Sequence, residues 1–143
     1  MRQRPHGEQL TIALVAHDNV KWQLLAWADR NKQELRHFRL VATGTTGRLL
    51  HNDLALDVER LASGPLGGDL QLGARIVDGQ IDALIYFWDP LEPQPHDPDV
   101  RSLLRVATLR DVPTASNPAT ADMVLAGMIE LRVASVPVVH SVS

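Results

Sequence analysis

Short, almost continuously apolar runs alternate with segments of helical spacing along this 143-residue chain. The clearest runs are LTIALVA at Leu10–Ala16 and IDALIYFW at Ile81–Trp88, and both are rich in strand-forming residues. Such runs are typical of strands that are buried on both faces of a sheet. Strands that alternate with helices form parallel sheets covered on both faces. We therefore predict an α/β fold, with a single, doubly wound domain and a mostly parallel sheet.

Local patterns predict the remaining elements and a single domain over residues 1–143, with residues 1–9 as a flexible N-terminal extension. A helix is expected over about Asn19–Phe38, where apolar residues recur on one side. Asn117–Pro118 combines a capping residue with a proline suited to the first helical position. Further predictions, in chain order, are a strand at 39–44, a helix at 45–54, a strand at 55–61, a helix at 70–79, a helix that starts at Pro98 with Asp97 as its cap, a strand at 112–116, a helix from 118 to about 127, and a last strand in the valine-rich tail after Gly127.

The composition excludes several classes of protein. The formal net charge of -3 argues against a nucleic-acid partner, which usually requires a basic face. The absence of cysteine excludes disulfides, thiolate metal sites and cysteine nucleophiles. The polar start MRQRPHGEQL lacks the apolar core of a signal peptide, and no apolar run approaches the roughly 20 residues of a membrane span. We therefore expect a cytoplasmic protein with no membrane partner.

Unusual polar and glycine residues follow four of the predicted strands. In open α/β sheets, ligands bind beyond the carboxyl ends of the strands, so these segments are expected to meet on one rim. The segments are His17–Asp18, Thr43–Gly47, Ser63–Asp69 and the loop from Asp89, which carries His96, Asp97 and Asp99.

Each segment also has an ordinary structural explanation, because such residues are common in helix caps and turns. Together, however, they supply small side chains, hydroxyls and backbone N–H groups, which suit a phosphate. Lys21 adds a cation one helical turn after His17. Neither a GxxxxGK[ST] string nor a GxGxxG string after the first strand is present. From the residues alone we predict a phosphoester site with acid–base chemistry.

Five longer strings resemble the methylglyoxal synthases, in order and without large gaps from about Leu10 to Asp122. They are LVAHDNVK, TGTTGRL, LASGPLGGDLQLGA, IYFWDPLEPQPHDPDVRSLLR and PTASNPATAD. The resemblance implies an enzyme of the glycolytic bypass that eliminates phosphate from dihydroxyacetone phosphate, through an enediol phosphate, without a metal or organic cofactor. It also implies a homohexamer that inorganic phosphate inhibits.

The resemblance implies a role for each matching residue. Asp69 corresponds to the catalytic base, and His96 to the histidine at the substrate carbonyl. Asp18 and Asp99 correspond to carboxylates that assist or orient these groups, and His17 and Lys21 to substrate-binding residues. The phosphate-binding segments correspond to Thr43, Gly44, Thr45, Thr46, Ser63 and Gly64.

Two other functions fit parts of the sequence. A non-catalytic phosphate-sensing regulatory module of the same fold would need the phosphate loops but neither Asp69, His96 nor Asp99. A plain assembly protein could use its tryptophans, which otherwise suit core or interface packing, but would leave the polar loops unexplained.

The family's long C-terminal segment carries a late arginine that approaches a neighbouring subunit, whereas the context of Arg132 here does not match it.

Overall fold

The computed structural model describes residues 9–63, 66–91 and 100–135. The strands are β1 (Thr11–Ala16), β2 (Arg39–Ala42), β3 (Val58–Arg60), β4 (Ala83–Phe87) and β5 (Thr114–Ala115). The helices are the 3-10 helix η1 (Asp18–Val20) and the α-helices α1 (Lys21–Arg30), α2 (Lys32–Leu35), α3 (Gly44–Leu54), α4 (Gly68–Val77), α5 (Val100–Leu109) and α6 (Pro118–Ser135).

The strands form one parallel sheet in the order β3-β2-β1-β4-β5. The central strand β1 pairs with β2 on one side, where Leu14 lies opposite Ala42, and with β4 on the other, where Ala16 lies opposite Phe87. Strand order therefore reverses direction at β1, which confirms the predicted doubly wound α/β fold.

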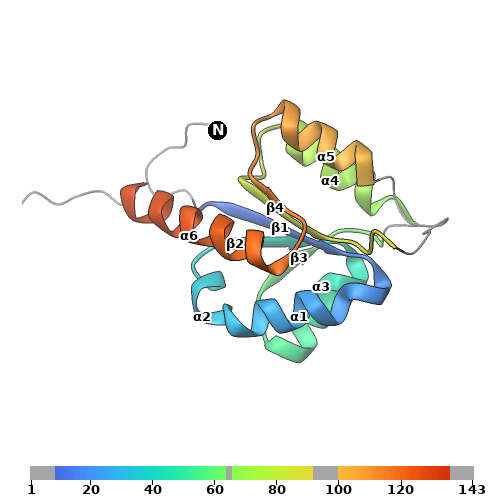
Figure 1. Cartoon of the computed structure of the whole chain (residues 1–143), viewed down its shortest axis with the longest axis horizontal. Coiled ribbons are helices and arrows are strands. Elements are labelled where there is room, and N and C mark those ends of the chain that lie inside the picture. Colours follow the sequence, from blue (N-terminus) through green and yellow to red (C-terminus); the bar gives the residue numbers. More distant parts are fainter. Residues whose placement is uncertain (1–8, 64–65, 92–99, 136–143) are drawn as a thin grey trace, which may run out of the picture.

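Helices cover both faces of the sheet (Figure 1). Because side chains alternate along a strand, β1 supplies Ile12 and Leu14 to one apolar cluster and Ala13 and Val15 to another. The first cluster contains residues of α1, α2, α3 and α6, and the second contains residues of α4 and α5. All six residues of β1 are buried, as the apolar run predicted.

The long helix expected over 19–38 is divided into three pieces. It begins as η1, continues as α1 to Arg30, and resumes as α2 after Asn31. The Asn31 side chain donates a hydrogen bond from Nδ2 to the carbonyl of Trp27, 2.9 Å away. An asparagine that binds the backbone in this way competes with continued helix formation, which accounts for the break.

The strand predicted after Gly127 is wrong for residues 128–135. Helix α6 continues through them to Ser135, and residues 136–143 lie outside the described residues. Leu125 and Met128, three residues apart, are both buried in the first apolar cluster. This burial keeps the chain helical through Gly127, because a glycine inside a helix costs only about 1 kcal/mol relative to alanine.

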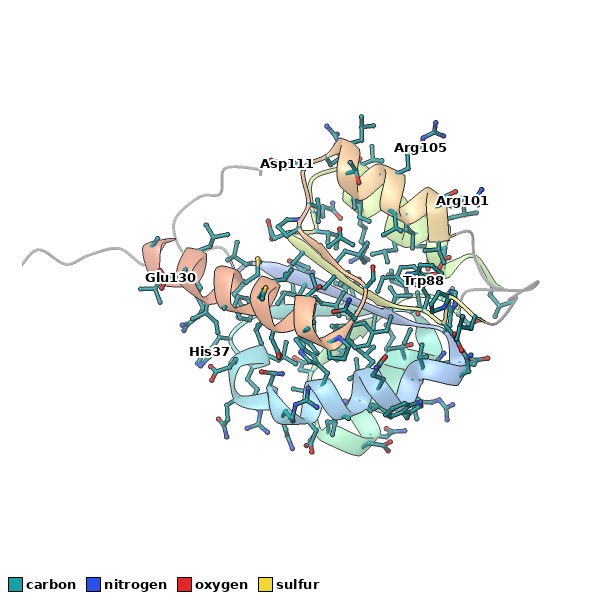
Figure 2. All side chains as sticks on the ribbon, in the orientation of Figure 1. His37, Trp88, Arg101, Arg105, Asp111 and Glu130 are labelled. Atoms are coloured by element: carbon teal, nitrogen blue, oxygen red, sulfur yellow. The ribbon has the colours of Figure 1, made fainter. Side chains whose placement is uncertain are left out.

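The three tryptophans have different environments. Trp27 is fully buried, and its Nε1 donates a hydrogen bond of 2.9 Å to Asp122 of α6. Trp88 packs partly buried against the second cluster, and Figure 2 places it beyond the end of β4. Trp22 is exposed.

Within residues 9–63, 66–91 and 100–135, we find no helix with the length and apolar character that a membrane crossing requires.

Glu59 of β3 makes two ion pairs, one with α4 and one with the neighbouring strand β2. Its carboxylate accepts hydrogen bonds from Arg75 of α4 and from Arg39 of β2, the latter at 3.3 Å. The hydrogen bond from Arg75, followed by the charges of both arginines, holds the pKa of Glu59 below its ordinary value. The same carboxylate raises the pKa of Arg75.

We expect Glu59→Gln to lower the free energy of unfolding near neutral pH but not in strong acid. Because the pKa of Glu59 is lowered by folding, its ion pairs stabilise the folded state above the pKa of the unfolded carboxyl. That contribution is lost as the pH falls through the folded-state pKa. Its size should be about 1 kcal/mol or less, because the Glu59 side chain is 35% exposed and therefore screened by solvent. Urea unfolding of both proteins across the acid range measures it, and a difference that is the same at every pH would contradict the assignment.

Candidate functional site

The carboxyl ends of β1, β2, β3 and β4 lie along one edge of the sheet, on the right of Figure 1. The candidate residues follow directly: His17 after β1, Thr43 after β2, and Ser63 shortly after β3. The parallel pairing of β1 with β2 sets the first two loops beside each other. The candidate site is therefore a set of neighbouring loops on one edge, as expected for an open α/β sheet.

The loop after β2 lies against the loop after β3. The backbone N–H of Gly44 donates a hydrogen bond of 3.2 Å to the carbonyl of Ala62. A Cβ at Gly44 would lie only 3.0 Å from the backbone nitrogen of Ser63, which is tighter than most Cβ contacts, so a glycine favours this close approach. The structure therefore brings the predicted phosphate residues Thr43, Gly44 and Ser63 together.

The start of α3 offers hydroxyl and N–H groups at one place. Thr43 is the residue before the helix, and it is buried, as is Thr46, whereas Thr45 is exposed. Thr46 is 3% exposed, and its Oγ1 has no hydrogen-bond partner among the described residues. The first N–H groups of a helix have no partner within it and carry its positive end, which is an arrangement that binds anions.

Helix α4 begins in tight contact with the loop after β3. The carbonyl of Ser63 accepts hydrogen bonds from the N–H groups of Leu66, at 3.0 Å, and Gly68, at 2.9 Å. A Cβ at Gly68 would fall 1.9 Å from the carbonyl oxygen of Ala62, which is an impossible distance. Only glycine therefore fits at this position without moving the loop.

Asp69 is the second residue of α4, directly after that glycine. Both of its carboxylate oxygens are buried from solvent. A carboxylate in the first turn is stabilised by the positive end of the helix. Two residues further, the side-chain oxygen of Gln71 accepts a hydrogen bond of 2.8 Å from the N–H of Ala62. The helix that carries Asp69 is thus attached to the Ser63 loop at two points.

His17 is held between β1 and β4. Its backbone N–H donates to the carbonyl of Phe87 at 3.0 Å, and its side chain is buried. Its Nε2 lies 3.0 Å from the hydroxyl of Tyr86, and the two rings meet edge to face. The imidazole therefore has a fixed position at the point where the strand order reverses.

Lys21 is anchored by the end of β1. Its ammonium donates hydrogen bonds to the carbonyl of Ala16, at 2.9 Å, and to the carboxylate of Asp18, at 2.6 Å. The hydrogen bond and the charge of Lys21 lower the pKa of Asp18, as does the nearby His17 to a smaller extent. The Asp18 side chain is 90% exposed, whereas that of Lys21 is 15% exposed. The structure thus brings His17, Asp18 and Lys21 into one group.

The predicted residues Gly64, His96 and Asp99 lie outside the described residues. Among the described ones, we find no group of three or more histidine or carboxylate side chains placed to hold a metal ion. Figure 2 shows Arg101 and Arg105 projecting outward from α5.

The sequence reading missed three residues that contact this edge. Tyr86 lies within an apolar run that predicts a buried strand, and that pattern assigns no role to its hydroxyl. Gln71 lay within a helical pattern. Asn19 donates a hydrogen bond of 2.8 Å from Nδ2 to Asp89, which joins η1 to the loop after β4. The sequence offers one signal for these three residues: each has a polar side chain close to the end of a strand or the start of a helix.

Comparison with known proteins agrees with the fold and with these motifs. The family described as the MGS-like domain matches residues 23–116. A methylglyoxal synthase of Hahella chejuensis is 54% identical over 122 residues, which cover 85% of this chain and 79% of the relative. A methylglyoxal synthase of Cellvibrio japonicus is 51% identical over 125 residues, which cover 87% and 81%.

The solved structures give a similar result. The crystal structure of methylglyoxal synthase from Elizabethkingia anophelis has a TM-score of 0.79 and 50% sequence identity to this chain. The match covers 82% of this chain and 77% of that one. Three findings agree: sequence identity above 50% to two methylglyoxal synthases over most of both chains, the match to the family, and the shared fold. The chain therefore belongs to the methylglyoxal synthase family.

Proposed function

We propose that this chain is a methylglyoxal synthase, a lyase that eliminates phosphate from dihydroxyacetone phosphate to give methylglyoxal and inorganic phosphate. The family membership supports the reaction class. The observation that carries the proposal is Asp69, whose buried carboxylate belongs to the first turn of α4, next to the glycine that is hydrogen-bonded to the Ser63 loop. This arrangement sets a candidate base beside a candidate phosphate site.

In the proposed first step, Asp69 removes a proton from the carbon that bears the substrate hydroxyl. The electron pair of that C–H bond forms a C=C bond, and the carbonyl oxygen gains the negative charge of an enediolate. Burial favours this step, because a carboxylate acts as a base near neutral pH only when it is shielded from water. His96 is proposed to stabilise the enediolate oxygen, with Asp99 and Asp18 orienting the groups.

In the second step, the hydroxyl on the deprotonated carbon loses its proton and becomes the aldehyde, while the C=C bond shifts to the carbon that bears the phosphate. The C–O bond to phosphate breaks, phosphate leaves with the electron pair, and a proton on the enediolate oxygen completes the enol of methylglyoxal. That enol then takes up a proton on carbon and becomes methylglyoxal. Elimination requires the breaking C–O bond to lie roughly perpendicular to the enediol plane, where it overlaps the π system. A phosphate held near that plane would favour isomerisation instead. The phosphate site is therefore proposed to set a torsion angle as well as affinity.

Two groups of residues are proposed to hold the phosphate and the rest of the substrate. The loop at the start of α3 contributes Thr43, Gly44, Thr45 and Thr46, and the adjoining loop contributes Ser63 and Gly64. His17 and Lys21 bind from the neighbouring end of β1. Helix N–H groups and the Lys21 ammonium can together balance the phosphate charge, so no metal or organic cofactor is needed in this scheme.

A phosphate-sensing module of the same fold is the alternative. It would need the loops after β2 and β3 but no buried carboxylate next to them, and the placement of Asp69 favours the enzyme.

We also propose that the chain acts in the cytoplasm as a single domain, that it assembles as a homohexamer, and that inorganic phosphate inhibits it.

One assay separates these functions. The purified protein is incubated with dihydroxyacetone phosphate in the presence of EDTA, and methylglyoxal and free phosphate are measured together. We expect the two products in equal amounts. Binding of the substrate without phosphate release would instead identify a sensor, and the absence of binding would leave only an assembly role.

We expect Asp69→Asn to lower kcat at least about a hundredfold, the usual scale for an acid–base residue, while inorganic phosphate binds nearly as well as before. The amide keeps the size of the carboxylate but cannot accept the proton. Asp78→Asn is the matched control, because it makes the same change at the exposed far end of the same helix. Near-normal turnover of the Asp69 variant would remove this residue from the role of base.

We expect Gly68→Ala to impair phosphate binding and turnover together. Its Cβ would fall 1.9 Å from the Ala62 carbonyl oxygen, so the Ser63 loop and the start of α4 must separate. Gly73→Ala is the control on the same helix, because its Cβ would meet Leu103 at an ordinary 3.8 Å. Calorimetric titration with phosphate and steady-state kinetics measure both effects. Equal behaviour of the two variants would show that the loop contact does not shape the site.

A further inference from the structure

We propose that Tyr86 is a positioning residue that fixes the tautomer of His17, so that His17 presents Nδ1–H as a hydrogen-bond donor. The inference rests on the substrate-binding role of His17 in the proposed function. It adds a residue from inside the sheet that no motif singled out.

The geometry of the pair supports a persistent hydrogen bond. The Tyr86 hydroxyl lies 3.0 Å from Nε2 of His17, and the ring centroids are 5.5 Å apart at an interplanar angle of 78°. Tyr86 is 0% exposed and His17 is 4% exposed, so water has little access to the bond. A hydrogen bond in such a place is stronger than one in water, and its loss costs more.

The backbone prevents the imidazole from moving away. The N–H of His17 is bound to the carbonyl of Phe87, and the carbonyl of His17 accepts from the N–H of Val20, both at 3.0 Å. Tyr86 lies in β4, the strand that pairs directly with β1. Both rings are thus attached to the two central strands, and the distance between them is set by the sheet.

The chemistry of the two groups gives the direction of the bond. A phenol is a far better donor than a neutral imidazole nitrogen, and its own oxygen is a weak acceptor. In a neutral histidine, one ring nitrogen carries the proton and the other accepts. With the Tyr86 hydroxyl donating to Nε2, the proton of His17 lies on Nδ1.

This tautomer suits the proposed substrate. A phosphate group and a carbonyl offer oxygen acceptors, so a nitrogen that donates attracts them and a nitrogen lone pair repels them. Without the phenol, His17 could also adopt the opposite tautomer, with its lone pair on Nδ1. Tyr86 therefore selects the form of His17 that can bind an anion.

Nitrogen NMR of ¹⁵N-labelled protein tests the tautomer directly, because protonated and unprotonated ring nitrogens have distinct shifts. His17→Gln identifies the signals of His17. We expect wild-type His17 to carry its proton on Nδ1, and Tyr86→Phe to shift it at least partly to Nε2. The ring of His51 is the internal reference and should not change, because its Nδ1 lies beside the carbonyl of Leu56 instead.

Binding measurements test the consequence, with inorganic phosphate as the probe and dihydroxyacetone phosphate as the substrate. Tyr86→Phe should weaken phosphate binding and raise KM about two- to tenfold, the range expected for one hydrogen bond, with kcat changed less. In a His17→Gln background the same substitution should have almost no effect, because Tyr86 acts through His17.

The outcomes are distinguishable. A wild-type proton on Nε2, or an unchanged tautomer in Tyr86→Phe, overturns the inference. So does an equal effect of Tyr86→Phe with and without His17, which would indicate a purely structural role. Failure of the wild type to release phosphate refutes the proposed function instead, and the spectra and phosphate affinities still decide the role of Tyr86.

Discussion

The parallel pairing of β1 with both β2 and β4 is the constraint on which the rest of the structure depends. Because β1 is buried on both faces, its side chains serve two separate apolar clusters and hold helices on both sides. Because the strands are parallel, the loops that follow them all leave the sheet at the same end, the carboxyl end of the strands. His17 and the Thr43 loop are neighbours for this reason, and the apolar core therefore determines where polar chemistry is possible.

A second constraint is the backbone contact between the loops at that edge. At Gly68 the chain comes too close to Ala62 for any side chain, and at Gly44 a Cβ would lie unusually close to Ser63. The loop after β3 is thereby packed between the starts of α3 and α4. The proposed phosphate site and the proposed base are consequently parts of one rigid arrangement, in which the relative position of Asp69 and the phosphate does not depend on long side chains. Such rigidity suits a reaction whose outcome depends on a torsion angle.

The sequence predicted the architecture because burial patterns are local and strong. The apolar run before His17 and the run containing Tyr86 were typical of buried strands, and the residues after them followed from the rule for strand ends. Three features depended on interactions that no local pattern reveals. Asn31 ends a helix through a bond to Trp27, four residues away, which the spacing of apolar residues does not show, and Met128 extends another by packing against the distant first cluster. Tyr86 contacts His17 across 69 residues of sequence, so only the register of β1 and β4 brings them together.

The arrangement of Lys21 has one more consequence. Its ammonium is fixed to the backbone at Ala16 and also bound to the exposed carboxylate of Asp18. Asp18 is therefore a counterion for Lys21 that the protein itself supplies. If Lys21 binds phosphate as proposed, the phosphate must replace Asp18 or share the ammonium with it, instead of displacing a dissolved ion. Binding at this lysine is thus an exchange between two negative groups, and the exchange favours a dianion such as phosphate over a singly charged competitor.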